Sequence, residues 1–221
     1  MKRKIATYFK GASCLTTLIV ASITNGGVAH AEGEVSYNAG IVSQYLWRGF
    51  DLNAEKLAVQ GGADYEHESG LYAGVWASKY DFGDSDDGIE IDIYGGYSLD
   101  ITDELWLDLS VTSYQYTGES DASLEWKIGL GHEFFEINYH HDQDLDTNYL
   151  ELNTNYPLNA MWSVNGHIGS NDDGDESYYD YAVFVTYSVA ESIEVSGGYS
   201  EHEFDEEGAE GAFFLDLHSS F

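Results

Sequence analysis

Carboxylate side chains recur at every second position in several segments of this 221-residue chain. Glu90 and Asp92 form one such pair, and Asp64 and Glu66 form another. Alternate side chains of an extended strand point to the same face of a sheet, so these acids would gather along one surface. Fixed negative charges at close quarters attract cations and repel anions. The other acids with this placement are Asp108, Glu125, Glu151 and Asp180.

Histidines and acidic loops raise the alternatives of catalysis and metal binding. His140-His141-Asp142 could suggest a metal site or a hydrolase base, but adjacent strand residues point to opposite faces and cannot ligate one ion without distortion. Residues 203–208 approach the start of an EF-hand loop, yet Phe214 stands where the closing bidentate Glu belongs. We therefore expect no catalytic residue, no specific metal site and no cofactor. Diffuse Mg²⁺ or Ca²⁺ binding by the acidic loops stays an alternative.

The first residues have the form of an export signal. Four basic residues lie near the start, an apolar stretch from Ala12 to about Ile23 follows, and Ala29-His30-Ala31 fits a signal peptidase site. Removing residues 1–31 as a cleaved signal peptide leaves a single domain, 32–221, without cysteine. This part has four basic residues and forty acidic ones, hence a net charge of −36. Such a charge makes nucleic acid an improbable partner.

A hydrophobic period of two runs through this domain and predicts strands. In the first, Val35 to about Arg48, Val35, Tyr37, Ile41, Tyr45 and Trp47 would share the apolar face. Further strands are expected at about 57–66, 70–80, 89–99, 104–116, 124–132, 134–142, 148–156, 161–170, 178–189, 192–200 and 211–221. Only the third strand resists assignment of its two faces, because aromatic residues lie on one and aliphatic residues on the other.

The links between these strands alternate between short turns and longer acidic loops. An even number of strands, lengths near the 9 to 11 residues that span a bilayer, and this alternation favour an outer-membrane barrel over a soluble sandwich or lipocalin-like barrel. In lipid, a closed sheet satisfies every backbone amide. The predicted fold is therefore all-β: a closed, antiparallel transmembrane β-barrel of about twelve strands, with short periplasmic turns and longer extracellular loops.

Two stretches resemble a known family. Residues 35–50, with Ser43, Tyr45, Arg48 and Gly49, resemble the opening SxYxxRG pattern of the TorF-type putative porins, a family of conserved hypothetical outer-membrane β-barrel proteins (Gcw_chp). Residues 60–78 and 90–97 are similar to it as well, and the similarity becomes looser afterwards. Residues 51–56 depart from the Ser/Gln-rich link expected after the Arg-Gly pair. The resemblance implies a channel.

The barrel and the acidic rows together predict a passive channel for small hydrophilic solutes, with a preference for cations. Arg48 and Lys127 would lie among the acids as pore-lining candidates, either neutralising a neighbouring carboxylate or narrowing and polarising the lumen. Lys79 would be a third cation that points into the lumen. A non-conducting structural or adhesive barrel with cation-binding loops is the alternative, and an enzyme is not expected.

The last residues alternate up to a terminal Phe221. Phe213, Leu215, Leu217 and Phe221 would face lipid on a strand that pairs with the first strand and closes the barrel. This ending resembles the C-terminal signal by which outer-membrane barrels are recognised, so we expect the barrel assembly machinery and outer-membrane lipid as partners in a Gram-negative outer membrane.

Overall fold

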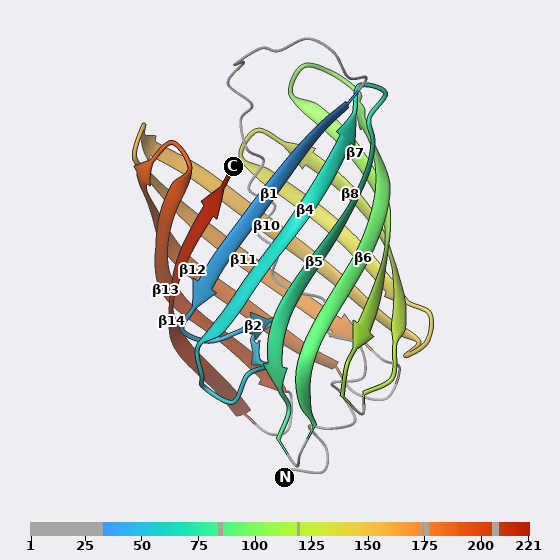
Figure 1. Cartoon of the computed structure of the whole chain (residues 1–221), viewed down its shortest axis with the longest axis vertical. Helices are drawn as coiled ribbons and strands as arrows, with labels where there is room; N and C mark the ends of the chain where they lie inside the picture. The colour runs from blue at the N-terminus through green and yellow to red at the C-terminus, as the bar shows by residue number, and fades with distance from the viewer. Residues whose placement is uncertain (1–32, 84–85, 119, 173, 175–176, 205–207) are drawn as a thin grey trace.

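The computed structural model of the chain describes residues 33–83, 86–118, 120–172, 174, 177–204 and 208–221. Twelve antiparallel strands form a closed barrel in the order β1-β14-β13-β12-β11-β10-β9-β8-β7-β6-β5-β4, as Figure 1 shows. The predicted signal peptide, residues 1–31, lies outside the described residues. No helix among the described residues is long and apolar enough to cross a membrane.

The barrel strands agree with the predicted segments to within a few residues at all but one end. Their bounds are β1 (Gly33–Val42), β4 (Ala58–His67), β5 (Leu71–Asp81), β6 (Asp87–Asp100), β7 (Leu105–Tyr116), β8 (Ser123–His132), β9 (Phe135–Asp142), β10 (Thr147–Asn159), β11 (Trp162–Asp172), β12 (Ser177–Ala190), β13 (Ile193–Phe204) and β14 (Gly208–Ser220).

Period-two alternation divides the side chains between the two faces of the barrel wall. On β12, Tyr179, Tyr181 and Val183 are exposed on the outside, while Tyr178 and Asp180 are buried inside. The third barrel strand, β5, now has its faces assigned: its aliphatic residues point outward and its aromatic residues inward. This inversion of the usual soluble pattern is what a lipid-facing barrel requires.

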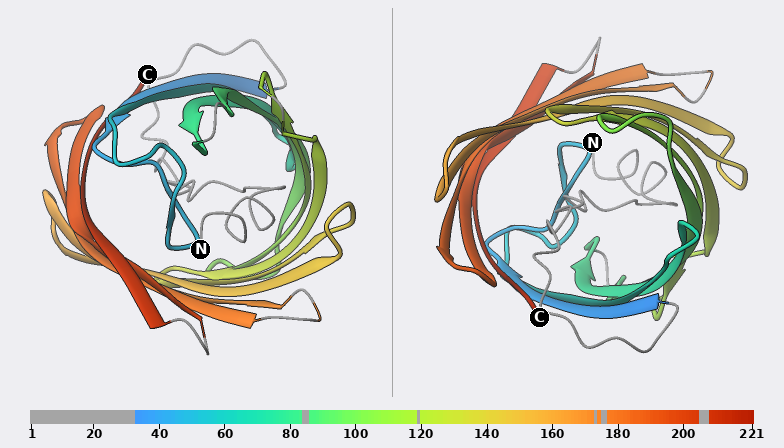
Figure 2. Two further views of the ribbon diagram at one scale, coloured as in Figure 1. Left: turned by 90° about the horizontal axis from the view of Figure 1, so that it is seen from below. Right: turned by 90° about the horizontal axis from the view of Figure 1, so that it is seen from above.

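The exception is the end of the first strand, which stops at Val42 and not near Arg48. The following residues leave the wall and form a small hairpin of β2 (Leu46–Trp47) and β3 (Phe50–Asp51). The prediction that Tyr45 and Trp47 belong to the outer face was therefore wrong, since both are buried. In Figure 2 the blue-to-cyan segment between β1 and β4 crosses the interior of the ring.

Closure depends on the pairing of the first and last strands. The ladder between β1 and β14 runs from Asn38 with Ser220 to Val42 with Asp216. Beyond it, Tyr37 and Phe221 exchange two backbone hydrogen bonds of 2.8 and 3.0 Å, and their rings stack 6.2 Å apart. Phe221 is thus part of the seam, the line along which β1 and β14 pair to close the barrel, as predicted.

Deleting Phe221 tests the seam. We expect the truncated chain to be exported but to assemble poorly, because the deletion removes two of the backbone hydrogen bonds beside a short ladder. Heat-modifiable electrophoretic mobility of membrane fractions measures the folded barrel. The matched variant Phe221→Ala keeps both backbone hydrogen bonds and should assemble better than the deletion; normal insertion of the truncated chain would contradict the seam's importance.

Candidate functional site: a hairpin docked across the lumen

The hairpin of residues 43–57 is built around a two-residue turn. Arg48 and Gly49 occupy the turn between Trp47 and Phe50, with φ angles of 45° and 86°. Two consecutive positive φ angles are typical of a type I′ turn, the usual connection of a tight hairpin. Such a conformation suits glycine and strains arginine, so contacts elsewhere must hold Arg48 in place.

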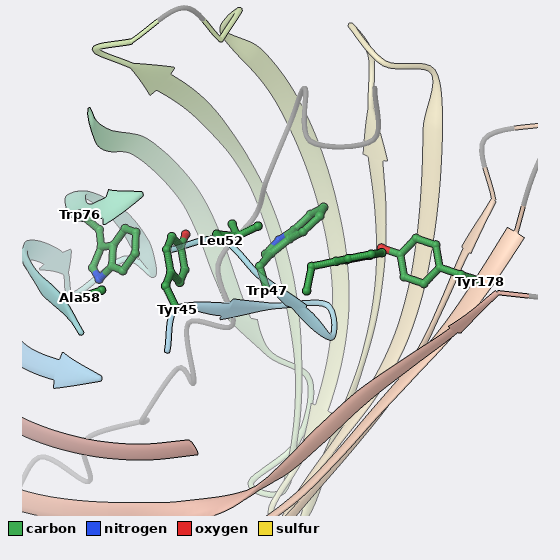
Figure 3. Packing of buried hydrophobic residues seen from close by; sticks show 7 residues of the cluster. Tyr45, Trp47, Leu52, Ala58, Trp76 and Tyr178 are labelled. Atoms are coloured by element: carbon green, nitrogen blue, oxygen red, sulfur yellow. The ribbon is translucent and has the colours of Figure 1, made fainter. Parts of the chain in front are cut away.

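Apolar packing fixes the base of the hairpin against the wall from which it emerges. Tyr45 and Trp76 of β5 lie with their ring centroids 5.7 Å apart, and Leu52 and Ala58 are completely buried in the same cluster. Figure 3 shows these side chains on the inside of the barrel. The Leu52 carbonyl also accepts a hydrogen bond of 2.8 Å from the backbone of Asp81. The lumen therefore contains an apolar core of its own.

The return segment is closed by polar contacts to the backbone. The Asn53 side-chain amide donates to the carbonyls of Lys56 and Leu57, at 3.1 and 3.0 Å. The Asp51 carboxylate accepts backbone N–H groups of Asn53 and Glu55. Burial raises the pKa of Asp51, and these two N–H groups oppose the rise. The segment is thus an ordered structure with its own turn contacts.

The tip of the hairpin docks on the opposite wall. Phe50 packs against the ring of Tyr178 at 5.0 Å and the ring of His202 at 4.0 Å. The His202 Nδ1 also lies 3.0 Å from the carbonyl oxygen of Gly49, to which it donates. A Cβ atom at Gly49 would lie 2.6 Å from the Cβ of His202 and 3.0 Å from that of Asp180. Only glycine fits this close approach.

Arg48 makes the one ion pair between the hairpin and this wall found among the described residues. Its Nη2 lies 2.8 Å from Oε2 of Glu125 on β8, and both side chains are buried. Its guanidinium carbon lies 3.8 Å from the ring centroid of Tyr149 and 4.6 Å from that of Trp47. Burial is the largest single influence on Arg48 and opposes its charge, but Glu125 and the neighbouring tyrosines, Tyr149 first among them, together outweigh burial and raise the pKa of Arg48 above its ordinary value. The guanidinium is held as a cation.

Glu125 begins a chain of polar contacts along β8 to β12. His140 bridges Glu125 and Glu151, with ring nitrogens 2.8 and 3.3 Å from their carboxylate oxygens. His167 lies 2.7 Å from Asp180, and the Tyr149 hydroxyl donates to Asp180 at 2.9 Å. Each carboxylate in this chain thus has a partner, as burial requires. The sequence placed these acids on one face but did not identify the histidines as their partners.

A second group of acids lies beneath the base of the hairpin. Glu90 is fully buried and accepts hydrogen bonds from Tyr45 at 2.9 Å and from Tyr116 at 3.3 Å. Asp92 is 5% exposed, and its Oδ1 has no hydrogen-bond partner in the described structure. The described structure shows no cation in hydrogen-bond contact with either carboxylate. This pair is therefore buried without a basic partner among the described residues.

The remaining predicted residues lie elsewhere on the barrel. Lys127 is 3.0 Å from Asp108, so this lysine neutralises a neighbouring carboxylate. Asp64 accepts hydrogen bonds from Asn38 and Tyr94, and Glu66, on the same face, is exposed. Lys79 is exposed on the face opposite to Ser78 and Tyr80, so its placement in the interior was wrong.

No group of three or more His, Cys, Asp or Glu side chains in the described residues could hold a metal ion. The EF-hand-like stretch includes residues 205–207, which lie outside the described residues. His140 and His141 occupy opposite faces of β9, as predicted, with His140 buried and His141 bonded to Asn148 at 3.1 Å. What the site offers is a set of positioned charges and aromatic rings.

Replacing Glu125 by glutamine should release the hairpin. The substitution leaves the buried Arg48 without its carboxylate, and breaking one side of a buried ion pair costs about 3 kcal/mol, which raises the undocked fraction about 100-fold. Trypsin cleavage after Arg48 reports undocking, and cleavage after the exposed Lys56 serves as the internal reference. The matched variant Glu136→Gln, on β9 beside Lys127, should leave cleavage after Arg48 unchanged. Equal protection in Glu125→Gln would show that the pair does not hold the hairpin.

Comparison with solved structures finds the same architecture at very low sequence identity. The KdgM porin in complex with disordered oligogalacturonate has a TM-score of 0.59 and 7% identity, with 85% of this chain and 98% of that chain covered. The NanC porin has a TM-score of 0.56 and 11% identity, with coverage of 85% and 99%. An outer-membrane channel from Pseudomonas putida F1 has a TM-score of 0.54 and 12% identity, with coverage of 87% and 96%. These similarities show that the chain has the fold of outer-membrane porins and channels.

No functionally curated protein matches the sequence. A family model does match it, over residues 27–216, which is most of the chain. The segments on which the resemblance rests, residues 35–50, 60–78 and 90–97, fall within that range. The chain therefore belongs to Gcw_chp, a family of bacterial proteins of unknown function.

Proposed function

We propose that this chain is an integral outer-membrane channel of a Gram-negative bacterium, through which small hydrophilic solutes diffuse passively, with a preference for cations. One observation carries the proposal. The strands of a closed barrel with an apolar exterior direct carboxylates such as Asp64, Glu125 and Asp180 to the interior, where the described residues place only two lysine or arginine side chains. Both of these, Arg48 and Lys127, are already ion-paired.

The sign of the interior charge narrows the class of solute. Inner carboxylates such as Asp64 and Glu66, which have no basic partner among the described residues, raise the local concentration of cations and exclude anions. An anionic sugar of the kind bound to the KdgM porin would be repelled by this interior. Solute and lipid would be the only partners needed for the function itself, and no covalent chemistry forms part of it. The TorF-type porin name, residues 1–31 as a cleaved signal peptide and delivery by the barrel assembly machinery belong to the same proposal.

The docked hairpin favours one alternative, a non-conducting structural or adhesive barrel. Its tip reaches from the β1–β4 side of the barrel to β8, β10 and β13, and its apolar side chains are buried. A channel with this hairpin in place has a narrowed lumen. Conductance therefore decides between a constricted channel and a closed barrel.

Shortening the hairpin tests whether it restricts a conducting lumen. Val42 and Ala58 are paired on β1 and β4, so an Asn-Gly turn can replace residues 43–57 without changing the ladder. In planar bilayers we expect discrete ohmic channels from the native chain and a several-fold larger conductance from the shortened one. The control replaces residues 143–146, which connect β9 and β10, by the same turn. Silence of both the native and the shortened barrel would favour the structural alternative.

Reversal potentials in a potassium chloride gradient test the charge preference. We expect the native channel to favour potassium over chloride, and the double variant Asp64→Asn, Glu66→Gln to lose at least half of that ratio, because it removes two inner carboxylates that have no basic partner among the described residues. Glu133→Gln, in the exposed β8–β9 turn, is the matched control and should have no effect. A native preference for chloride would overturn the proposed selectivity.

A further inference from the structure

The wall site that receives Arg48 is assembled by residues of the wall itself. Oε1 of Glu125 is fixed by His140 at 2.8 Å and by the Tyr114 hydroxyl at 3.2 Å, which leaves Oε2 for Arg48. The Tyr149 hydroxyl is fixed by Asp180 and His167, each at 2.9 Å. None of these contacts involves the hairpin. The carboxylate and the ring would therefore keep their positions if Arg48 were absent.

The geometry of this site suits a guanidinium group. A carboxylate oxygen lies 2.8 Å from a guanidinium nitrogen, and the face of Tyr149 lies 3.8 Å from the guanidinium carbon. A planar, weakly hydrated cation gains both from a charged hydrogen bond and from stacking on an aromatic face. A potassium ion has no N–H donors and no planar face that stacks, and urea has both of these but no charge. Both contacts together select guanidinium.

Arg48 reaches this site as a tethered group on a strained turn. Its φ of 45° is unfavourable for a side chain with a Cβ, and the hairpin that carries it is anchored on β1, β4 and β5 on the other side of the lumen. Tethering gives Arg48 a high effective concentration at the site. The docked hairpin thus resembles a complex between a receptor site on the wall and a ligand that belongs to the same chain.

We propose that Glu125 and Tyr149 form a guanidinium-binding site, that Arg48 occupies it as an internal ligand, and that solutes carrying a guanidinium group compete with Arg48 for it. The part of this inference that concerns permeating solutes rests on the proposed channel function. The binding site itself does not, because it can be measured on the folded barrel in micelles. Displacement of Arg48 by a solute would free the tip of the hairpin and widen the lumen.

Arg48→Gly is the variant that empties the site with least disturbance, because glycine readily adopts the positive φ of this position. Thermal unfolding of the barrel in micelles is measured with 0–50 mM guanidinium chloride, against equal concentrations of potassium chloride and of urea. We expect a saturable rise in Tm of about 3–5 °C for Arg48→Gly at a tenfold excess over Kd. The native chain, whose site is filled, should show less than a third of this rise.

The double variant Arg48→Gly, Glu125→Gln removes the carboxylate and should show no rise. Arg48→Asn, which also tolerates the turn, provides a second empty-site variant if Arg48→Gly does not fold. The proposal is overturned if neither empty-site variant gives a saturable rise, if potassium or urea gives the same rise, or if the native chain or the double variant responds equally. Conductance is measured separately. Binding in micelles with silent bilayers would refute only the channel, whereas conducting bilayers without binding would refute only the guanidinium site.

Discussion

Closure of the sheet is the constraint on which the rest of the structure depends. Twelve strands satisfy one another's backbone groups only if β1 and β14 meet, and their ladder is among the shorter ones in the barrel. Once the ring is closed, strict alternation assigns each strand residue to lipid or lumen. Lipid covers the apolar exterior, so the barrel needs no apolar core inside it. The interior is free to contain acids, histidines and a folded hairpin that a soluble β-sandwich would exclude.

The polar interior follows from the need to satisfy buried charge. Tyrosine hydroxyls and histidine rings surround the inner carboxylates, as Tyr149 and His167 surround Asp180 and as His140 connects Glu125 with Glu151. Tyrosine hydroxyls reduce the cost of burial without cancelling the negative charge, and a histidine ring cancels a charge only when it is protonated. Lysine and arginine side chains would have cancelled it at any physiological pH. The described interior uses only Arg48 and Lys127 in this way, so a strongly acidic chain keeps an acidic lumen.

Strands were predictable because each one is specified locally, by alternation over about ten residues. The hairpin was not, because alternation continues from Ile41 through Tyr45 to Trp47 and gives no local sign that the chain leaves the wall. The contacts that hold it are distant: Arg48 and Glu125 are 77 residues apart in sequence. The Arg48-Gly49 pair between Trp47 and Phe50 was the available signal, since a two-residue link that ends in glycine between aromatic residues is typical of a hairpin turn.

Because the strands are specified locally and the interior is not, the fold can be shared with solved porins and channels at 7–12% identity. Lipid requires only that the outer positions be apolar, and many sequences meet that requirement. The inner positions carry no such requirement, so their charge can be reversed from one barrel to another without loss of closure. Fold similarity therefore says little about solute preference. Under the proposed function, that preference would come from inner groups that are fixed in geometry, such as Glu125 with Tyr149.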